Sequence, residues 1–98
     1  MQHLDVFTVR ERAIRAVILQ YPNLDTGDIV LTAPLFPERA AKPIPVITPL
    51  VQLDGETLVV GTHLLAGIRK TGLVEHVGTL EPHRYDISRA IDRLFFGN

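Results

Sequence analysis

The sequence contains no cysteine, so it cannot form a disulfide, a thiolate zinc site or a cysteine nucleophile. It also has no run of roughly 18 apolar residues, the length that a helix needs to cross a bilayer. Residues 1–5 lack the basic start and the apolar stretch of a signal peptide. These absences predict a cytoplasmic protein that does not associate with a membrane.

A strong excess of basic charge is missing as well. Ten lysine and arginine residues stand against eleven aspartate and glutamate residues, and the formal net charge is −1. A dedicated non-specific nucleic-acid binder usually carries a marked basic excess, so that class of protein is disfavoured. A candidate basic patch for phosphate groups nevertheless consists of Arg69, Lys70, Arg84 and Arg89. A solvated charged surface is the simpler explanation for these residues, and a nucleic-acid partner stays open.

The chain is rich in apolar residues, which make up 46% of its 98 residues. This length supplies one hydrophobic core and too little material for a second, so residues 1–98 are predicted to form a single domain. Strand and helix patterns together predict an α+β fold with a small mixed sheet and packed helices. The high apolar content also favours a surface that binds a partner protein.

An N-terminal helix is predicted over residues 8–21. Thr8 and Glu11 match a capping box, in which each side chain binds a free amide of the first helical turn. Apolar residues recur along one face at helical spacing. They are Val9, Ala13, Ala16 and Val17. Pro22 is expected to end this helix, because proline cannot continue its hydrogen bonds.

The remaining predicted elements follow in order: a strand at 28–32, a proline-rich loop at 33–45, a hairpin and helix at 46–71, a strand at 73–80 and a helix at 86–96. The hairpin joins strands 46–53 and 57–60 through Asp54-Gly55, a dipeptide typical of a two-residue hairpin turn. The helix that follows the hairpin is expected to end at Gly72.

Three apolar residues are candidates for contact with a partner protein. Leu35 and Phe36 lie inside the proline-rich loop, whose length suits a lid or a binding loop. Near the other end of the chain, Phe95 and Phe96 cannot both face inward on one helix. Phe95 is placed on the apolar side, so Phe96 is the candidate interface residue. A homodimer through such a surface stays open.

The junction after the second hairpin strand is the main candidate for a ligand site. The strand runs through Gly61 directly into the predicted helix, and Thr62 would be its N-terminal cap. Such a junction directs free backbone amides and the positive end of a helix at one spot, which suits a phosphate group. The candidate ligand-binding residues are Gly61, Thr62, His63 and Leu64. A purely structural strand-to-helix turn explains the same pattern.

Residues 43–80 resemble the core of the ParB/sulfiredoxin-like superfamily. The resemblance rests on Pro45-Val46, the Asp54-Gly55 hairpin and the run Gly61-Thr62-His63-Leu64-Leu65-Ala66, which occur in the order of that family. It implies a ParB/sulfiredoxin-like fold whose junction holds nucleotide phosphates. Members of the superfamily act in DNA partitioning, sulfinic-acid reduction, nucleic-acid cleavage and small-molecule phosphorylation.

The residues that usually carry this chemistry are replaced. ParB-type proteins have G-E-R-R at the junction, whereas this chain has Gly61-Thr62-His63-Leu64 and lacks the phosphate-binding guanidinium groups. Sulfiredoxin-type proteins have G-C-H-R, and threonine here replaces the cysteine, which excludes thiolate chemistry. We therefore assign no catalytic residue and no certain cofactor, and nucleotide binding stays open. No metal site is predicted, because the histidines lack a recognised ligand spacing.

Three functions are consistent with these features. The first is a small ParB-like binding or regulatory protein of plasmid, phage or nucleoid context, which acts without catalysis through a protein or nucleic-acid partner. The alternative is a nucleotide-dependent enzyme, a phosphotransferase or nuclease, that uses the Gly61-Thr62-His63 junction. The third is an interaction or inhibitor protein whose loop 33–45 docks on a host target. The replaced reactive groups favour the first function over an enzyme.

Overall fold

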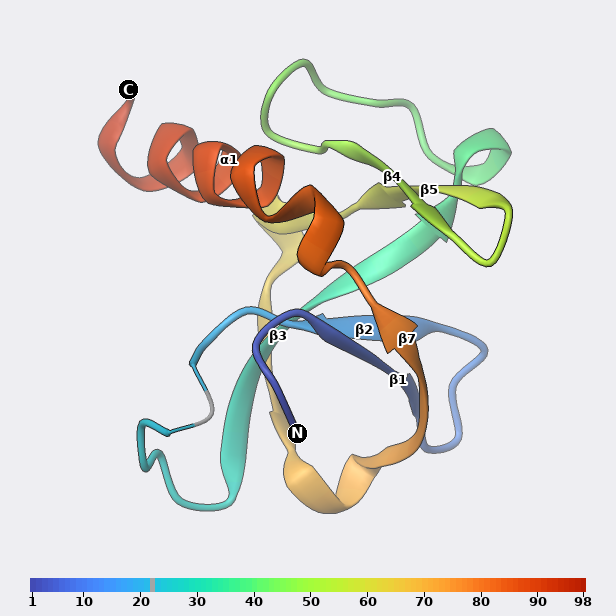
Figure 1. The fold of residues 1–98 in the computed structure, drawn as a ribbon, viewed down its shortest axis with the longest axis vertical. Coiled ribbons are helices and arrows are strands. Elements are labelled where there is room, and N and C mark those ends of the chain that lie inside the picture. Colours follow the sequence, from blue (N-terminus) through green and yellow to red (C-terminus); the bar gives the residue numbers. More distant parts are fainter. Residues whose placement is uncertain (22) are drawn as a thin grey trace.

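A computed structural model describes residues 1–21 and 23–98 (Figure 1). The strands are β1 (Asp5–Val9), β2 (Arg15–Ile18), β3 (Ile29–Pro37), β4 (Leu50–Leu53), β5 (Glu56–Val60), β6 (Ala66–Arg69) and β7 (Leu73–Thr79). The helical elements are the single 3-10 turns η1 (Glu38–Ala40), η2 (Thr62–Leu64), η3 (Lys70–Gly72) and η4 (Glu81–His83), and the α-helix α1 (Arg84–Phe96).

The strands form one curled sheet in the order β4-β5-β3-β2-β1-β7, and β6 pairs with β3 off this path. Every pairing among these strands is antiparallel. α1 lies across one end of the sheet, next to the loop that leads into β4 (Figure 1). The α+β prediction is therefore confirmed. The predicted mixed sheet with several packed helices is wrong, because in residues 1–21 and 23–98 a single α-helix covers an antiparallel sheet.

The predicted N-terminal helix over residues 8–21 is wrong, because this segment contains the end of β1 and all of β2. Thr8 does not cap a helix: its Oγ1 accepts a hydrogen bond from the N–H of Glu75 at 3.1 Å, across the β1–β7 pair. Residues 16–19 are buried one after another. A short continuous apolar run fits a helix and a buried strand equally well, and its β-branched residues favour the strand. Pro22, predicted to end the helix, lies outside the described residues.

The helix predicted from Thr62 onward is also wrong, because this segment returns to the edge of β3. β3 pairs with β6 through residues 29–32 and with β5 through residues 35–37. Between these stretches, the carbonyl of Pro34 accepts the N–H of Gly61 at 2.8 Å. In an antiparallel strand, the backbone N–H and C=O of one residue point toward the same neighbouring strand. The carbonyl of Pro34 points toward the edge shared by β5 and β6, so this edge lacks the N–H that another residue would supply there. The ladder cannot continue there, and the chain makes the η2 turn before β6.

The proline-rich loop predicted at residues 33–45 begins as a strand. β3 extends to Pro37, and Leu35 lies opposite Arg15 of β2 and Val60 of β5. Proline is accepted in a strand where it need not donate a hydrogen bond to a neighbour. The irregular segment is residues 41–49, between η1 and β4.

Three predictions for the second half of the chain are confirmed. Asp54 and Gly55 form the turn between β4 and β5, with φ values of 50° and 78° that suit a type I′ turn. β7 matches the strand predicted at 73–80, and α1 matches the helix predicted at 86–96, although it begins at Arg84. The next residue after α1 is a glycine with φ of 73°, which is typical of a helix C-terminus.

The core lies between the curled sheet and the inner face of α1. Its largest fully buried side chains include Leu4, Ile18, Leu58, Leu80 and Ile87. Burying one aliphatic side chain of this size stabilises a fold by about 1.5–3 kcal/mol. No helix formed by residues 1–21 and 23–98 combines the length and the hydropathy of a membrane span.

Leu58 tests how the β4–β5 hairpin contributes to the core. Leu58→Ala removes a fully buried side chain, and such a truncation costs about 2–5 kcal/mol of unfolding free energy. Leu50 on the paired strand is 44% exposed, so Leu50→Ala is the matched control and should cost less than about 1 kcal/mol. Urea denaturation measures both values, and equal losses would contradict the register of this hairpin.

Gly61 tests the close packing at the end of β5. A Cβ atom there would lie 3.0 Å from Cε2 of Phe36 and 3.1 Å from Cγ of Pro34. We therefore expect Gly61→Ala to lose about 1–3 kcal/mol through overpacking. At Gly72, an added Cβ would lie 3.4 Å from Cγ2 of Ile68, which is ordinary contact. Gly72→Ala should keep or gain stability, because alanine restricts the unfolded chain. Thermal unfolding checks the pair, and an unchanged Tm for Gly61→Ala would refute the packing argument.

Candidate functional site

The predicted ligand-binding junction is divided between the core and the surface. Thr62 is fully buried, and its Oγ1 has no hydrogen-bond partner among the described residues. His63 and Leu64 are exposed and line, with Gly61, a cleft of about 230 Å³ that also includes Lys42. Because η2 is a single turn, it lacks the aligned amides of a longer helix. Ligand binding at these residues stays a prediction that the cleft alone supports.

The four residues of the predicted basic patch lie in three different clefts. Arg69 and Lys70 line a small cleft beside β6. Arg84 belongs to a cleft at the N-terminal segment, and Arg89 lies beside the loop that precedes β4. A nucleic-acid backbone would therefore meet these charges in separate places.

The predicted partner-binding residues differ in exposure. Leu35 is 2% exposed and belongs to the core, so a partner cannot reach it in this conformation. Phe36 is partly exposed and lines the cleft beside His63. Phe96 is 73% exposed, and Phe95, which was expected to face inward, is 59% exposed. The sequence identified one exposed aromatic residue at this end of α1, and the structure adds a second.

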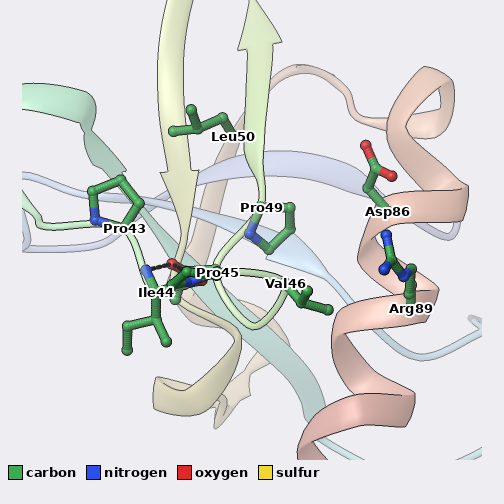
Figure 2. Close-up of a pocket in the computed structure, with 9 residues that line it drawn as sticks. Pro43, Ile44, Pro45, Val46, Pro49, Leu50, Asp86 and Arg89 are labelled. Carbon is green, nitrogen blue, oxygen red and sulfur yellow. Dashed lines mark hydrogen bonds between the residues drawn. The ribbon is translucent and has the colours of Figure 1, made fainter. Parts of the chain in front are cut away.

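A second surface, here named the proline cleft, lies between α1 and the loop before β4 (Figure 2). It has a volume of about 430 Å³, and its lining includes Pro43, Pro45 and Pro49. Asp86 and Arg89 of α1 line the same cleft on its helix side. The loop is held by Thr48, whose Oγ1 accepts the N–H of Ile44 at 2.6 Å. Val46 has a φ of 70°, which is a genuine outlier for a β-branched residue and marks a tightly constrained segment.

A third surface, here named the histidine cleft, lies between the N-terminal segment, β7 and η4. It has a volume of about 870 Å³, and its lining includes His3, Asp5, Tyr21, His76, Glu81 and Arg84. Nε2 of His76 lies 3.2 Å from Oδ1 of Asp5. Sequence reasoning missed this pair, because no local spacing connects a residue of β1 with one of β7. In the part of the chain that the structure describes, no three His, Asp or Glu side chains are arranged to hold a metal ion.

Comparison with known proteins supports the fold. A solved structure described as an endoribonuclease from mycobacterial species matches with a TM-score of 0.74, over 94% of this chain and 88% of that chain. The sequence identity is 18%, so this similarity shows a shared fold alone. Comparison with curated protein sequences finds no significant match.

A family model described as CcdB protein matches residues 5–97. This match overturns the resemblance to the ParB/sulfiredoxin-like superfamily, and that prediction is wrong together with the ParB-like fold it implied. The resemblance relied on a strand-to-helix junction, whereas the structure has a strand, one turn and another strand at these positions. With 93 consecutive residues matched, from residue 5 to residue 97, the chain belongs to the CcdB family.

Proposed function

We propose that this chain is the toxin of a toxin–antitoxin pair and acts in the cytoplasm by binding other proteins. Its membership of the CcdB family over residues 5–97 supports this function. The partners would be an antitoxin and DNA gyrase. The proposal replaces the ParB-like regulator. The inhibitor protein that docks on a host target, which was the third function drawn from the sequence, is retained. Its docking surface is now the end of α1 and no longer the loop at residues 33–45.

The observation that carries the proposal is the exposed aromatic end of α1. The helix buries Ile87 and Ala90 near its start, while its last turn extends beyond the sheet with Phe95 and Phe96 exposed (Figure 1). Adjacent exposed aromatic side chains are costly in water and are typical of a surface that a partner covers.

The outer face of α1 continues this surface toward the proline cleft. Tyr85, Arg89 and Arg93 follow each other at intervals of four residues, and Phe96 comes three residues later. This spacing places them along one side of a helix. Aromatic and arginine side chains are enriched in protein interfaces, where they supply most of the binding energy. The composition of this face therefore suits a protein partner.

A nuclease is a second candidate function, favoured by the fold shared with the endoribonuclease. It corresponds to the enzyme alternative drawn from the sequence, and it has more support than the ParB-like regulator. The residues first considered for it include Thr62, which is buried. Thr62 therefore cannot contact a substrate in this conformation, whereas the exposed His63 can.

Supercoiling of DNA by purified gyrase tests the proposed target. We expect the purified chain to inhibit this reaction. Phe96→Ser should raise the concentration for half-inhibition by about 30-fold or more, because loss of one aromatic hot spot costs about 2 kcal/mol or more.

The matched control is Leu24→Ser, which removes an exposed apolar side chain from the loop between β2 and β3. This variant should inhibit as strongly as the unmodified chain, and circular dichroism should show that both variants are folded. Failure of the unmodified chain to inhibit gyrase would refute gyrase as the target. Equal weakening by the two substitutions would refute the end of α1 as the contact.

A further inference from the structure

We propose that the histidine cleft is a ribonucleolytic site, in which His76, oriented by Asp5, acts with His3 to cleave single-stranded RNA. The inference rests on the nuclease candidate and adds to it a site and a substrate class. It does not involve the junction at residues 61–64.

The centre of the site is the pair of Asp5 and His76. The side chain of Asp5 is 11% exposed, and its Oδ2 accepts the N–H of Gln2 at 2.7 Å. Its Oδ1 lies 3.2 Å from Nε2 of His76, whose side chain is 53% exposed. A carboxylate fixed in this way holds the orientation and the tautomer of the imidazole, and leaves Nδ1 as the proton acceptor. The pair has the geometry of a general base that a substrate can reach.

A bulge in β7 lies next to the pair of Asp5 and His76. Val6 lies opposite Gly78, but Phe7 lies opposite His76, so Val77 is an extra residue in β7. In a regular ladder, Val77 would lie opposite Phe7. Bulges of this kind often redirect a side chain beside an active site. The rings of Phe7 and His76 lie 5.2 Å apart between centroids, so the phenyl ring also supports the imidazole.

The same cleft supplies an acid, a cation and a stacking surface. The rings of His3 and Tyr21 are stacked, with centroids 4.2 Å apart and planes at 20°. Arg84 pairs with Glu81 at 3.4 Å, and both side chains are more than half exposed. An exposed pair of this kind is weak, so a phosphate group can replace the carboxylate of Glu81 on the guanidinium. The repulsion between Glu81 and a phosphate is relieved when the glutamate turns toward solvent.

RNA fits these groups because it carries its own nucleophile. His76 takes the proton of a ribose 2′-hydroxyl, and the 2′-oxygen attacks the adjacent phosphorus. The bond between phosphorus and the 5′-oxygen of the next nucleotide breaks, and protonated His3 gives its proton to that oxygen. The products are a 2′,3′-cyclic phosphate and a 5′-hydroxyl, and exchange with solvent restores both histidines. Single-stranded RNA is the substrate because an unpaired base can stack on the exposed ring of Tyr21.

The test uses the purified full chain and a single-stranded RNA oligonucleotide of mixed sequence, with DNA of the same sequence beside it. We expect cleavage of the RNA to products with 2′,3′-cyclic phosphate ends, and no cleavage of the DNA, which lacks the nucleophile. His76→Gln should lower the rate about 100-fold or more, as expected for loss of a general base. Glu38→Gln replaces an exposed carboxylate of η1 outside the cleft and should leave the rate unchanged.

Asp5 acts through His76 and is a positioning residue, so its variant needs a separate readout. Asp5→Asn should lower kcat about 10-fold or more and leave KM unchanged, because the carboxylate touches the imidazole and not the substrate. A merely structural loss would instead lower the fraction of folded protein, which circular dichroism measures, and leave the kcat of the folded fraction intact.

The outcomes of these cleavage experiments distinguish a wrong site from a wrong function. RNA cleavage that survives His76→Gln, or that falls equally in Glu38→Gln, would overturn the histidine cleft as the site while the nuclease function stands. Absence of RNA cleavage by the unmodified chain would overturn both. Gel filtration separates the chain from contaminating ribonucleases, so only cleavage that co-elutes with the chain is counted.

Discussion

Strand β3 joins the two halves of the sheet, and most other features depend on its hydrogen bonds. Along one edge it pairs with β2 through residues 32–35, and along the other edge with β6 and then β5. Pro34 removes one donor from the second edge, so the ladder breaks there and η2 fills the gap. Each antiparallel pairing fixes the register of its neighbour. One long strand therefore determines where both ends of the chain lie.

The two proposed functional surfaces arise on opposite sides of β3. On the side of β2, strands β1 and β7 bring Asp5 to His76. On the other side, β5 and β4 connect to the loop at residues 41–49, and α1 lies beside that loop with its aromatic end exposed. A protein partner requires apolar area, whereas cleavage of RNA requires proton transfer and a cation. The apolar surface for a partner and the groups for RNA cleavage lie in separate parts of the molecule. A substitution can therefore remove one function and leave the other.

The sequence correctly predicted the elements whose structure depends mainly on interactions between residues close together in the chain. The turn at Asp54-Gly55 and the helix α1 require no distant partner, and both could be predicted. The run at residues 16–19 also fits a helix locally, but pairing of β2 with β1 and β3 overrides that pattern. The exposure of Phe96 could also be predicted, because two adjacent phenylalanines cannot both face inward on one helix. The contact between Asp5 and His76 could not be predicted, because a long-range strand pairing creates it.

Cross-strand nuclear Overhauser effects along β3 test this account most directly. We expect backbone proton contacts from Val30 to Ile68, from Ala33 to Val17 and from Leu35 to Val60, as the three ladders require. Successive amide–amide contacts through residues 8–21 or 62–71, without the contact from Leu35 to Val60, would contradict the account. β3 would then not organise the sheet, and neither the pair of Asp5 and His76 nor the placement of α1 would follow.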